Sequence, residues 1–114
     1  MLVLDDDRAF RNMLRAALGE AGYEVAGASN GAAGLELAGA WTPDVILLDM
    51  RMPGMDGRSF ARRYADLPGP RAPIVVLSAF RDADAPIANA VAYVTKPFEL
   101  DELIGLLGRV ASPA

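Results

Sequence analysis

Short aliphatic runs separated by helical patterns constrain the fold of this 114-residue chain more than any other feature. The runs at residues 2–4, 45–48 and 74–77 are apolar without alternation, which is typical of strands covered on both faces. Weaker strand patterns lie at residues 23–28 and 93–95. Because helical periodicity separates the runs, five parallel strands should alternate with about five helices in a doubly wound α/β sheet.

The fourth of the expected helices is poorly marked in the sequence. Only seventeen residues separate Ser78 from Lys96, and they must hold two loops, a helix and the start of a strand. Pro86 falls inside this segment and disfavours a helix interior there. We therefore expect the fourth helix to be shortened to a turn or two, or frayed.

Polar residues follow four of the expected strands at the point where each strand ends. Asp5 and Asp6 follow the first strand, Asp49 the third, Ser78 the fourth and Lys96 the fifth. Ligands of parallel sheets bind beyond the carboxyl ends of the strands, where the strand order reverses. The sequence thus predicts a site at this edge of the sheet.

The three aspartates at this edge require a positive partner. Each pair of like charges at 4 Å costs about 4 kcal/mol at an effective dielectric constant near 20. Carboxylate oxygens suit Mg²⁺ or another divalent cation such as Mn²⁺. We expect Asp6 and Asp49 to be direct ligands and Asp5 to bind directly or through water. With Lys96, the cation would neutralise the site, so that an anionic phosphoryl donor could approach.

The side chains available for chemistry at this edge are few. The chain has no cysteine and no histidine, which excludes thiolate nucleophiles, imidazole bases and zinc clusters. An ionised carboxylate can attack phosphorus and form an acyl phosphate. Asp49 is the expected nucleophile, and Lys96, the only lysine beside ten arginines, is expected to neutralise phosphoryl oxygens.

Four sequence motifs resemble those of the receiver domains of two-component response regulators. They are Val3-Leu4-Asp5-Asp6-Asp7, Leu47-Leu48-Asp49-Met50-Arg51-Met52-Pro53-Gly54-Met55-Asp56-Gly57, Val76-Leu77-Ser78-Ala79 and Tyr93-Val94-Thr95-Lys96-Pro97-Phe98. The motifs occur in the family's order and span essentially the whole chain. The resemblance implies a flavodoxin-like sheet with strand order 2-1-3-4-5 and a single receiver domain over residues 1–114, without an output domain in this chain.

The resemblance also implies roles for the residues around the phosphorylation site. Asp5 and Asp6 correspond to the family's metal-binding acidic pair, and Asp49 to its phosphorylated residue. The backbone carbonyl of Arg51 corresponds to a further metal ligand. Ser78 corresponds to the hydroxyl that closes onto the phosphoryl group and helps to switch the domain.

Residues near the fifth strand have implied roles as well. Lys96 corresponds to the lysine that pairs with the phosphoryl group, and Pro97 to a proline that follows a cis peptide bond. Tyr93 corresponds to the aromatic residue that moves inward in the switch, and Gly57 to the glycine that ends the loop after the phosphorylation site. Taken singly, these residues also have plain structural readings, such as a tyrosine packed on an edge strand.

We compared three functions for such a chain. The first is a signalling domain that accepts a phosphoryl group from a sensor histidine kinase or phosphotransfer protein. Such a domain would act on an effector protein, on a missing output domain or by forming a homodimer. The second is a degenerate receiver that acts as a phosphorylation-independent adaptor or dimerisation module. A flavin-binding electron carrier would need a hydroxyl- and glycine-rich phosphate loop where this chain has aspartates. A phosphoryl-accepting domain of the first kind would not be a conventional turnover enzyme, because it is itself modified stoichiometrically.

Charge and hydropathy limit the expected partners and location. The net charge is −4 and the arginines are scattered, so we expect no direct contact with nucleic acid. The chain shows neither a signal-peptide pattern nor an apolar run long enough to span a membrane. We therefore expect a cytoplasmic protein without a membrane partner.

Overall fold

The computed structural model describes residues 1–52, 54–78 and 87–111 as five strands and four helices. In chain order these are β1 (Leu2–Leu4), α1 (Arg8–Glu20), β2 (Ala26–Ala28), α2 (Gly31–Ala40), β3 (Ile46–Asp49), α3 (Gly57–Ala65), β4 (Ile74–Ser78), β5 (Ala90–Thr95) and α4 (Leu100–Ala111). All neighbouring strands are parallel, in the order β2-β1-β3-β4-β5. The expected fold class and strand order are therefore confirmed.

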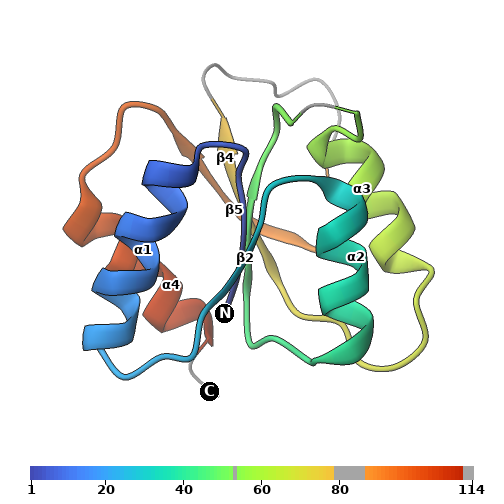
Figure 1. The fold of residues 1–114 in the computed structure, drawn as a ribbon, viewed down its shortest axis with the longest axis horizontal. Helices are drawn as coiled ribbons and strands as arrows, with labels where there is room; N and C mark the ends of the chain where they lie inside the picture. The colour runs from blue at the N-terminus through green and yellow to red at the C-terminus, as the bar shows by residue number, and fades with distance from the viewer. Residues whose placement is uncertain (53, 79–86, 112–114) are drawn as a thin grey trace.

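The helices cover both faces of the sheet. Figure 1 shows α1 and α4 on one face and α2 and α3 on the other, with the sheet seen nearly edge-on between them. Successive side chains of a strand point to opposite faces, so each aliphatic run serves two cores. Leu2 and Leu4 pack toward α2 and α3, whereas Val3 packs with Leu14 and Leu18 of α1. This double coverage explains why the runs show no polar alternation.

Polar side chains cap the first three helices where the chain leaves the sheet. Oδ1 of Asp7 accepts hydrogen bonds from the backbone N–H groups of Ala9 and Phe10, at 3.0 and 3.2 Å. Oδ1 of Asn30 and Oδ1 of Asp56 cap α2 and α3 by accepting hydrogen bonds of 2.8 Å from the backbone N–H groups of Ala33 and Ser59. These side chains satisfy N–H groups that lack partners inside the helix.

Helix α2 packs closely against the sheet because a glycine faces it. A Cβ atom at Gly34 would overlap Cδ2 of Leu4 and would lie 3.2 Å from Cε1 of Phe60. Leu4 and Phe60 are both fully buried. This packing joins β1, which leads into the site, to α2 and α3.

Two strands begin three residues away from their predicted starts, whereas β3 and β4 differ from the prediction by one residue at most at either end. The strand β5 begins at Ala90 rather than at residue 93, because Ala90 and Ala92 also pair with β4, across a register shift. The strand β2 covers only Ala26–Ala28, while the preceding Tyr23 and Val25 pack beside the core of α1 and α4. Most of the segment expected to hold a short fourth helix, residues 79–86, lies outside the described residues.

Among the described helices, none is long and apolar enough to cross a membrane.

Candidate functional site

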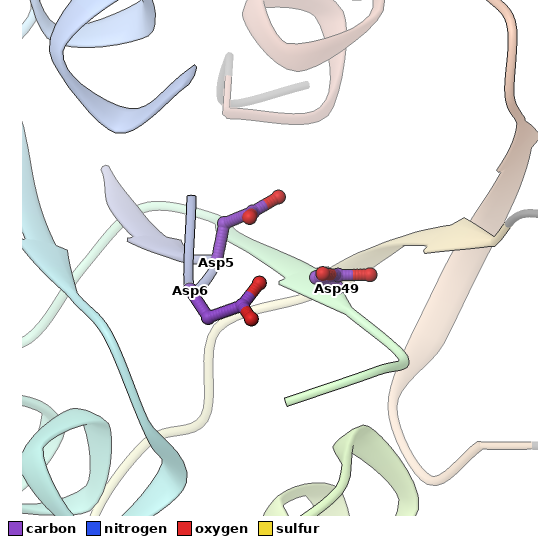
Figure 2. A group of neighbouring side chains, drawn as sticks. All are labelled: Asp5, Asp6 and Asp49. Carbon is purple, nitrogen blue, oxygen red and sulfur yellow. The ribbon is translucent and has the colours of Figure 1, made fainter. Parts of the chain in front are cut away.

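The neighbouring strands β1 and β3 bring three aspartates together. Leu4 and Leu48 are paired in register, so Asp5, just after β1, and Asp49, the last residue of β3, come directly after this pair. The backbone N–H of Asp5 donates to the carbonyl of Ala28 at 3.1 Å, which extends the pairing with β2 by one residue. Carboxylate oxygens of Asp5, Asp6 and Asp49 lie within 4.8 Å of one another (Figure 2). The sequence prediction that these three side chains meet is therefore correct.

The aspartates differ in burial, and burial raises the pKa of the two that are buried. Asp5 and Asp49 are 2% and 4% exposed, whereas Asp6 is exposed. Burial raises the pKa of Asp5 to about 6, against a smaller lowering by the Asp7 amide, and the charge of Asp49 raises it further. Burial also raises the pKa of Asp49, against lowering by the Arg51 amide and the Lys96 charge.

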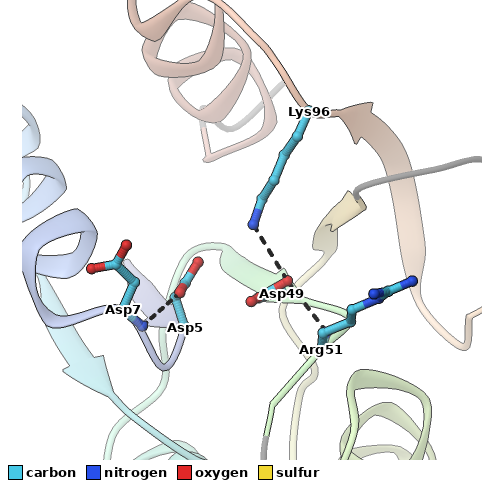
Figure 3. Close-up of polar contacts among 5 residues, drawn as sticks. All are labelled: Asp5, Asp7, Asp49, Arg51 and Lys96. Carbon is cyan, nitrogen blue, oxygen red and sulfur yellow. Dashed lines mark hydrogen bonds and ion pairs between the residues drawn. The ribbon is translucent and has the colours of Figure 1, made fainter.

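One oxygen of Asp49 receives two positive or polar contacts. The backbone N–H of Arg51 donates to Oδ1 at 3.3 Å, and Nζ of Lys96 lies 3.7 Å from the same atom (Figure 3). Neither of these contacts involves Oδ2. The Arg51 side chain is exposed and extends away from Asp5 in this view. A carboxylate held on one oxygen keeps the other available to a reactant.

The acidic group has the donors that a divalent cation needs. Oδ1 of Asp5 accepts a hydrogen bond from the Asp7 amide at 2.9 Å. Oδ2 of Asp5 is buried without a hydrogen-bond partner among the described residues. A buried, unpaired carboxylate oxygen is costly unless it is protonated or meets a cation. The three carboxylates thus fit a hard cation with oxygen ligands.

An open hollow of about 460 Å³ gives access to this group. It is lined by Asp5, Asp6, Asp7, Phe10, Asp49, Lys96, Pro97 and Phe98. The peptide bond between Lys96 and Pro97 is cis. Because Lys96 reaches into the hollow from the end of β5, a bound anion would meet a cation on one side and the aspartates on the other.

Ser78 and Gly57 lie at the ends of elements that border the site. Ser78 is buried at the end of β4, and its carbonyl accepts a hydrogen bond from the Lys96 amide at 2.8 Å. This bond fixes the start of the Lys96 segment to β4. Gly57 begins α3, and a Cβ atom there would lie 2.9 Å from Cα of Met50. The loop after Asp49 therefore closes against the first residue of α3.

Tyr93 lies on the edge strand β5 with its side chain outward. The residue is 52% exposed, and its hydroxyl accepts a hydrogen bond from the Ile87 amide at 2.9 Å. In the sheet order, β5 lies beyond β4 and is separated from β1 by β3 and β4. The ring therefore lies outside the hollow in this conformation, and an inward movement would have to break the bond to Ile87.

Two features near the site were not identified from the sequence. Phe10 and Phe98 form an edge-to-face ring pair, with centroids 5.9 Å apart, that joins α1 to the segment after Pro97. Arg11 donates a hydrogen bond from Nη1 to the carbonyl of Asp5 at 2.8 Å. Phe10 belongs to the apolar stripe of α1, which by itself indicates core packing. Arg11 has no sequence marker beyond its place one turn after Asp7.

Known proteins match this chain along most of its length. Residues 1–107 match the family described as the response regulator receiver domain. The chain is 39% identical over 114 residues to the DNA-binding transcriptional regulator NtrC of Escherichia coli, covering 96% of the chain and 24% of NtrC. The chain thus spans about a quarter of that relative's length.

Two solved structures are similar in fold and carry magnesium. The receiver domain of a sensor histidine kinase from Pseudomonas aeruginosa, with a magnesium ion coordinated in its active site cleft, superposes with a TM-score of 0.85 at 30% identity. The alignment covers 96% of this chain and 94% of that one. The response regulator TrrA of Thermotoga maritima, in complex with Mg²⁺ and BeF, gives a TM-score of 0.79 at 32% identity, with 96% of each chain covered.

Proposed function

This chain belongs to the response regulator receiver domain family, and we propose that its Asp49 accepts a phosphoryl group in a Mg²⁺-dependent reaction. The observation that carries the proposal is one hollow that holds a buried carboxylate, a lysine ammonium 3.7 Å from it and two further carboxylates. The buried carboxylate is the nucleophile, the ammonium neutralises phosphoryl oxygens, and the two further carboxylates can bind a divalent metal.

Asp49 performs the covalent step in this proposal. Its Oδ2 attacks the phosphorus of a phosphohistidine donor and forms the new P–O bond. The P–N bond of the donor breaks, and its electron pair returns to the imidazole nitrogen, which can take up a proton. Phosphoryl transfer depends mainly on positioning and on neutralising the equatorial oxygens. The Arg51 amide on Oδ1 holds the Asp49 carboxylate in orientation.

The metal would be held by Asp5, Asp6, Asp49 and the backbone carbonyl of Arg51. When bound, Mg²⁺ supplies positive charge to the phosphoryl oxygens. The fit rests on the buried, unpaired Oδ2 of Asp5 and on the spacing of the three carboxylates. The magnesium in the cleft of the Pseudomonas aeruginosa receiver supports the same choice of metal.

Lys96 and Ser78 complete the proposed phosphoryl site. The ammonium of Lys96 turns from the Asp49 carboxylate to the oxygens of the transferred group, which its flexible stem allows. The buried Ser78 hydroxyl, at the end of β4, donates to another of these oxygens. Movement of this hydroxyl and of Tyr93 would report phosphorylation at the exposed side of β5, where a partner could bind.

The proposed partners follow from this chemistry. A sensor histidine kinase or a phosphotransfer protein supplies the phosphoryl group. The phosphorylated chain acts on an effector protein, on an output domain in a longer protein, or by forming a homodimer. The relative NtrC is a DNA-binding transcriptional regulator, which makes control of transcription one candidate output. The domain is a stoichiometric phosphoryl acceptor that assists its own dephosphorylation.

Intact-mass spectrometry after incubation with acetyl phosphate and Mg²⁺ tests the proposal. We expect one phosphoryl adduct on the wild type, none on Asp49→Asn and none when the metal is chelated. Asp44→Asn is the matched control, since Asp44 is an exposed aspartate just before β3, and it should form the adduct normally. If the wild type binds Mg²⁺ but forms no adduct, the phosphorylation-independent adaptor becomes the better account.

A further inference from the structure

Arg11 connects α1 to the peptide between two of the aspartates. Its Nη1 donates to the carbonyl of Asp5 at 2.8 Å, and this carbonyl belongs to the peptide that joins Asp5 to Asp6. A hydrogen bond from a charged donor is shorter and stronger than one between neutral groups. The residue is half-buried, so water competes with this bond less than on an open surface.

The position of Arg11 is itself fixed at two points. Its backbone N–H donates to the Asp7 carbonyl at 3.0 Å, within the first turn of α1. Its stem passes over β2, where a Cβ atom at Gly27 would lie 3.4 Å from the arginine Cδ. The backbone and the stem of Arg11 are therefore both held in place, and the guanidinium reaches the Asp5 carbonyl from this fixed position.

The peptide held by Arg11 determines where both carboxylates point. On its other side, Asp5 is tied to β2 by the bond from its N–H to Ala28. From this peptide, the Asp5 side chain turns into the protein and that of Asp6 stays exposed. A rotation of the peptide plane would move both carboxylates relative to Asp49, with which they lie within 4.8 Å.

Arg11 does not act as a counter-ion in this arrangement. Across residues 1–52, 54–78 and 87–111, the ion pair found is that between Lys96 and Asp49, so Arg11 has none there. The charges that shift the pKa of Asp5 most are those of Asp49, Lys96 and Asp6. The guanidinium thus serves the site through the backbone carbonyl.

We propose that Arg11 is a positioning residue, which fixes the Asp5–Asp6 peptide so that the two carboxylates and Asp49 can bind one divalent cation. The inference rests on the proposed function, because it assigns the origin of that site's metal affinity. Partners that orient metal ligands affect affinity by about 10- to 100-fold when they are removed. Arg11 acts on a ligand's backbone, so we expect the lower end of that range.

The test measures Mg²⁺ affinity by calorimetric titration of Arg11→Gln and Arg15→Gln. Arg15 is exposed on the same helix, so its substitution removes the same charge. The dissociation constant of Arg11→Gln should rise about tenfold, while that of Arg15→Gln stays within about twofold of the wild type. Without metal, the amide resonance of Asp6 should shift in Arg11→Gln but not in Arg15→Gln. Thermal unfolding confirms that each variant is folded.

Three results decide the inference. Equal Mg²⁺ affinity in Arg11→Gln and the wild type overturns it, and so does an equal loss in both glutamine variants, which would indicate a long-range charge effect. If Arg11→Gln does not fold, Arg11→Lys against Arg15→Lys replaces the pair, with weaker binding expected only for the former. A wild type that binds no Mg²⁺ overturns the proposed function itself, whereas a binding wild type with an unchanged Arg11→Gln overturns only the role of Arg11.

Discussion

Nζ of Lys96 lies 3.7 Å from Oδ1 of Asp49, although the lysine side chain is 39% exposed and the aspartate side chain only 6%. Lys96 directly follows β5 and Asp49 ends β3, with β4 between the two strands. The lysine therefore crosses one strand to bring its charge from the rim of the hollow to a buried carboxylate. A compact ammonium on a flexible stem can move from that carboxylate to a phosphoryl oxygen, which a rigid guanidinium fork does less well.

The first prediction concerns the rate of phosphorylation in Lys96→Ala. Removing one preorganised cationic partner of the transferred group should slow adduct formation by about 100-fold, with Mg²⁺ saturating. Lys96→Arg should recover part of that loss, since it keeps the charge but changes its geometry. The initial rate of adduct formation from acetyl phosphate measures both. Arg109→Ala, an exposed cation in the last turn of α4, should react as the wild type does, and an equal rate in Lys96→Ala would contradict the prediction.

The second prediction concerns the stability of the metal-free protein as a function of pH. The folded-state pKa of Asp5 is raised to about 6 from 3.8, so the folded protein binds the proton more tightly than the unfolded chain. Its contribution to stability is therefore present below the unfolded value and is lost as the pH rises through about 6. The raised pKa of Asp49 acts in the same direction.

The substitution Asp5→Asn removes the loss of stability that accompanies ionisation of Asp5, because an asparagine side chain cannot ionise. With metal chelated, the variant should be more stable than the wild type near pH 7.5 by up to about 3 kcal/mol, and by almost nothing near pH 4. Urea unfolding at the two pH values measures the difference. Asp44→Asn, at an exposed position, should show no such gain, and a gain of equal size at both pH values would exclude titration of Asp5 as the cause.

The third prediction concerns stabilisation by Mg²⁺. A ligand that binds only the folded state at 100 times its dissociation constant adds about 2.7 kcal/mol to the free energy of unfolding. Asp6→Asn should lose most of this gain yet keep the metal-free stability, because Asp6 is exposed. Scanning calorimetry with and without Mg²⁺ separates the two effects. An equal rise in melting temperature in Asp6→Asn and the wild type would remove Asp6 from the proposed ligand set.

The fourth prediction concerns the hydrogen bond between Tyr93 and Ile87. If Tyr93 moves inward on phosphorylation, the Ile87 amide loses its acceptor at 2.9 Å. Amide hydrogen exchange at Ile87 should then accelerate when beryllium fluoride and Mg²⁺ occupy the site, since beryllium fluoride is a tetrahedral stand-in for the phosphoryl group. Tyr93→Phe should accelerate the same amide without any ligand. Unchanged exchange at Ile87 in the ligated wild type would argue against movement of Tyr93.

The fold and most of the acidic group follow from the sequence for one physical reason. Aliphatic runs covered on both faces indicate parallel strands, and such strands place their carboxyl ends at one edge. Asp5 and Asp49 therefore meet once β1 and β3 are neighbours, and that neighbourhood was expected from the strand order that the family resemblance implies. Lys96 follows from the same reasoning, because β5 ends at the same edge.

Contacts that depend on side-chain direction did not follow from the sequence. The bond from Arg11 to the Asp5 carbonyl requires the stem of the arginine to lie over Gly27, which no periodicity encodes. The hydrogen bond from the Ile87 amide to the Tyr93 hydroxyl likewise has no sequence pattern, and β5 starts at Ala90, three residues before its predicted start. Helix α2 gives a further case, since Gly34 and Gly39 look equally unfavourable in its sequence.

The last prediction separates these two glycines of α2. Alanine favours a helix over glycine by about 1 kcal/mol, and a Cβ atom at Gly39 meets nothing within 4 Å, so Gly39→Ala should stabilise the protein by 0.5 to about 1 kcal/mol. A Cβ atom at Gly34 would overlap Cδ2 of the buried Leu4. Overpacking costs about 1 to 3 kcal/mol and should exceed the helical gain, so Gly34→Ala should destabilise. Urea unfolding of both variants gives the two signs, and stabilisation by both would mean that β1 and α2 separate easily.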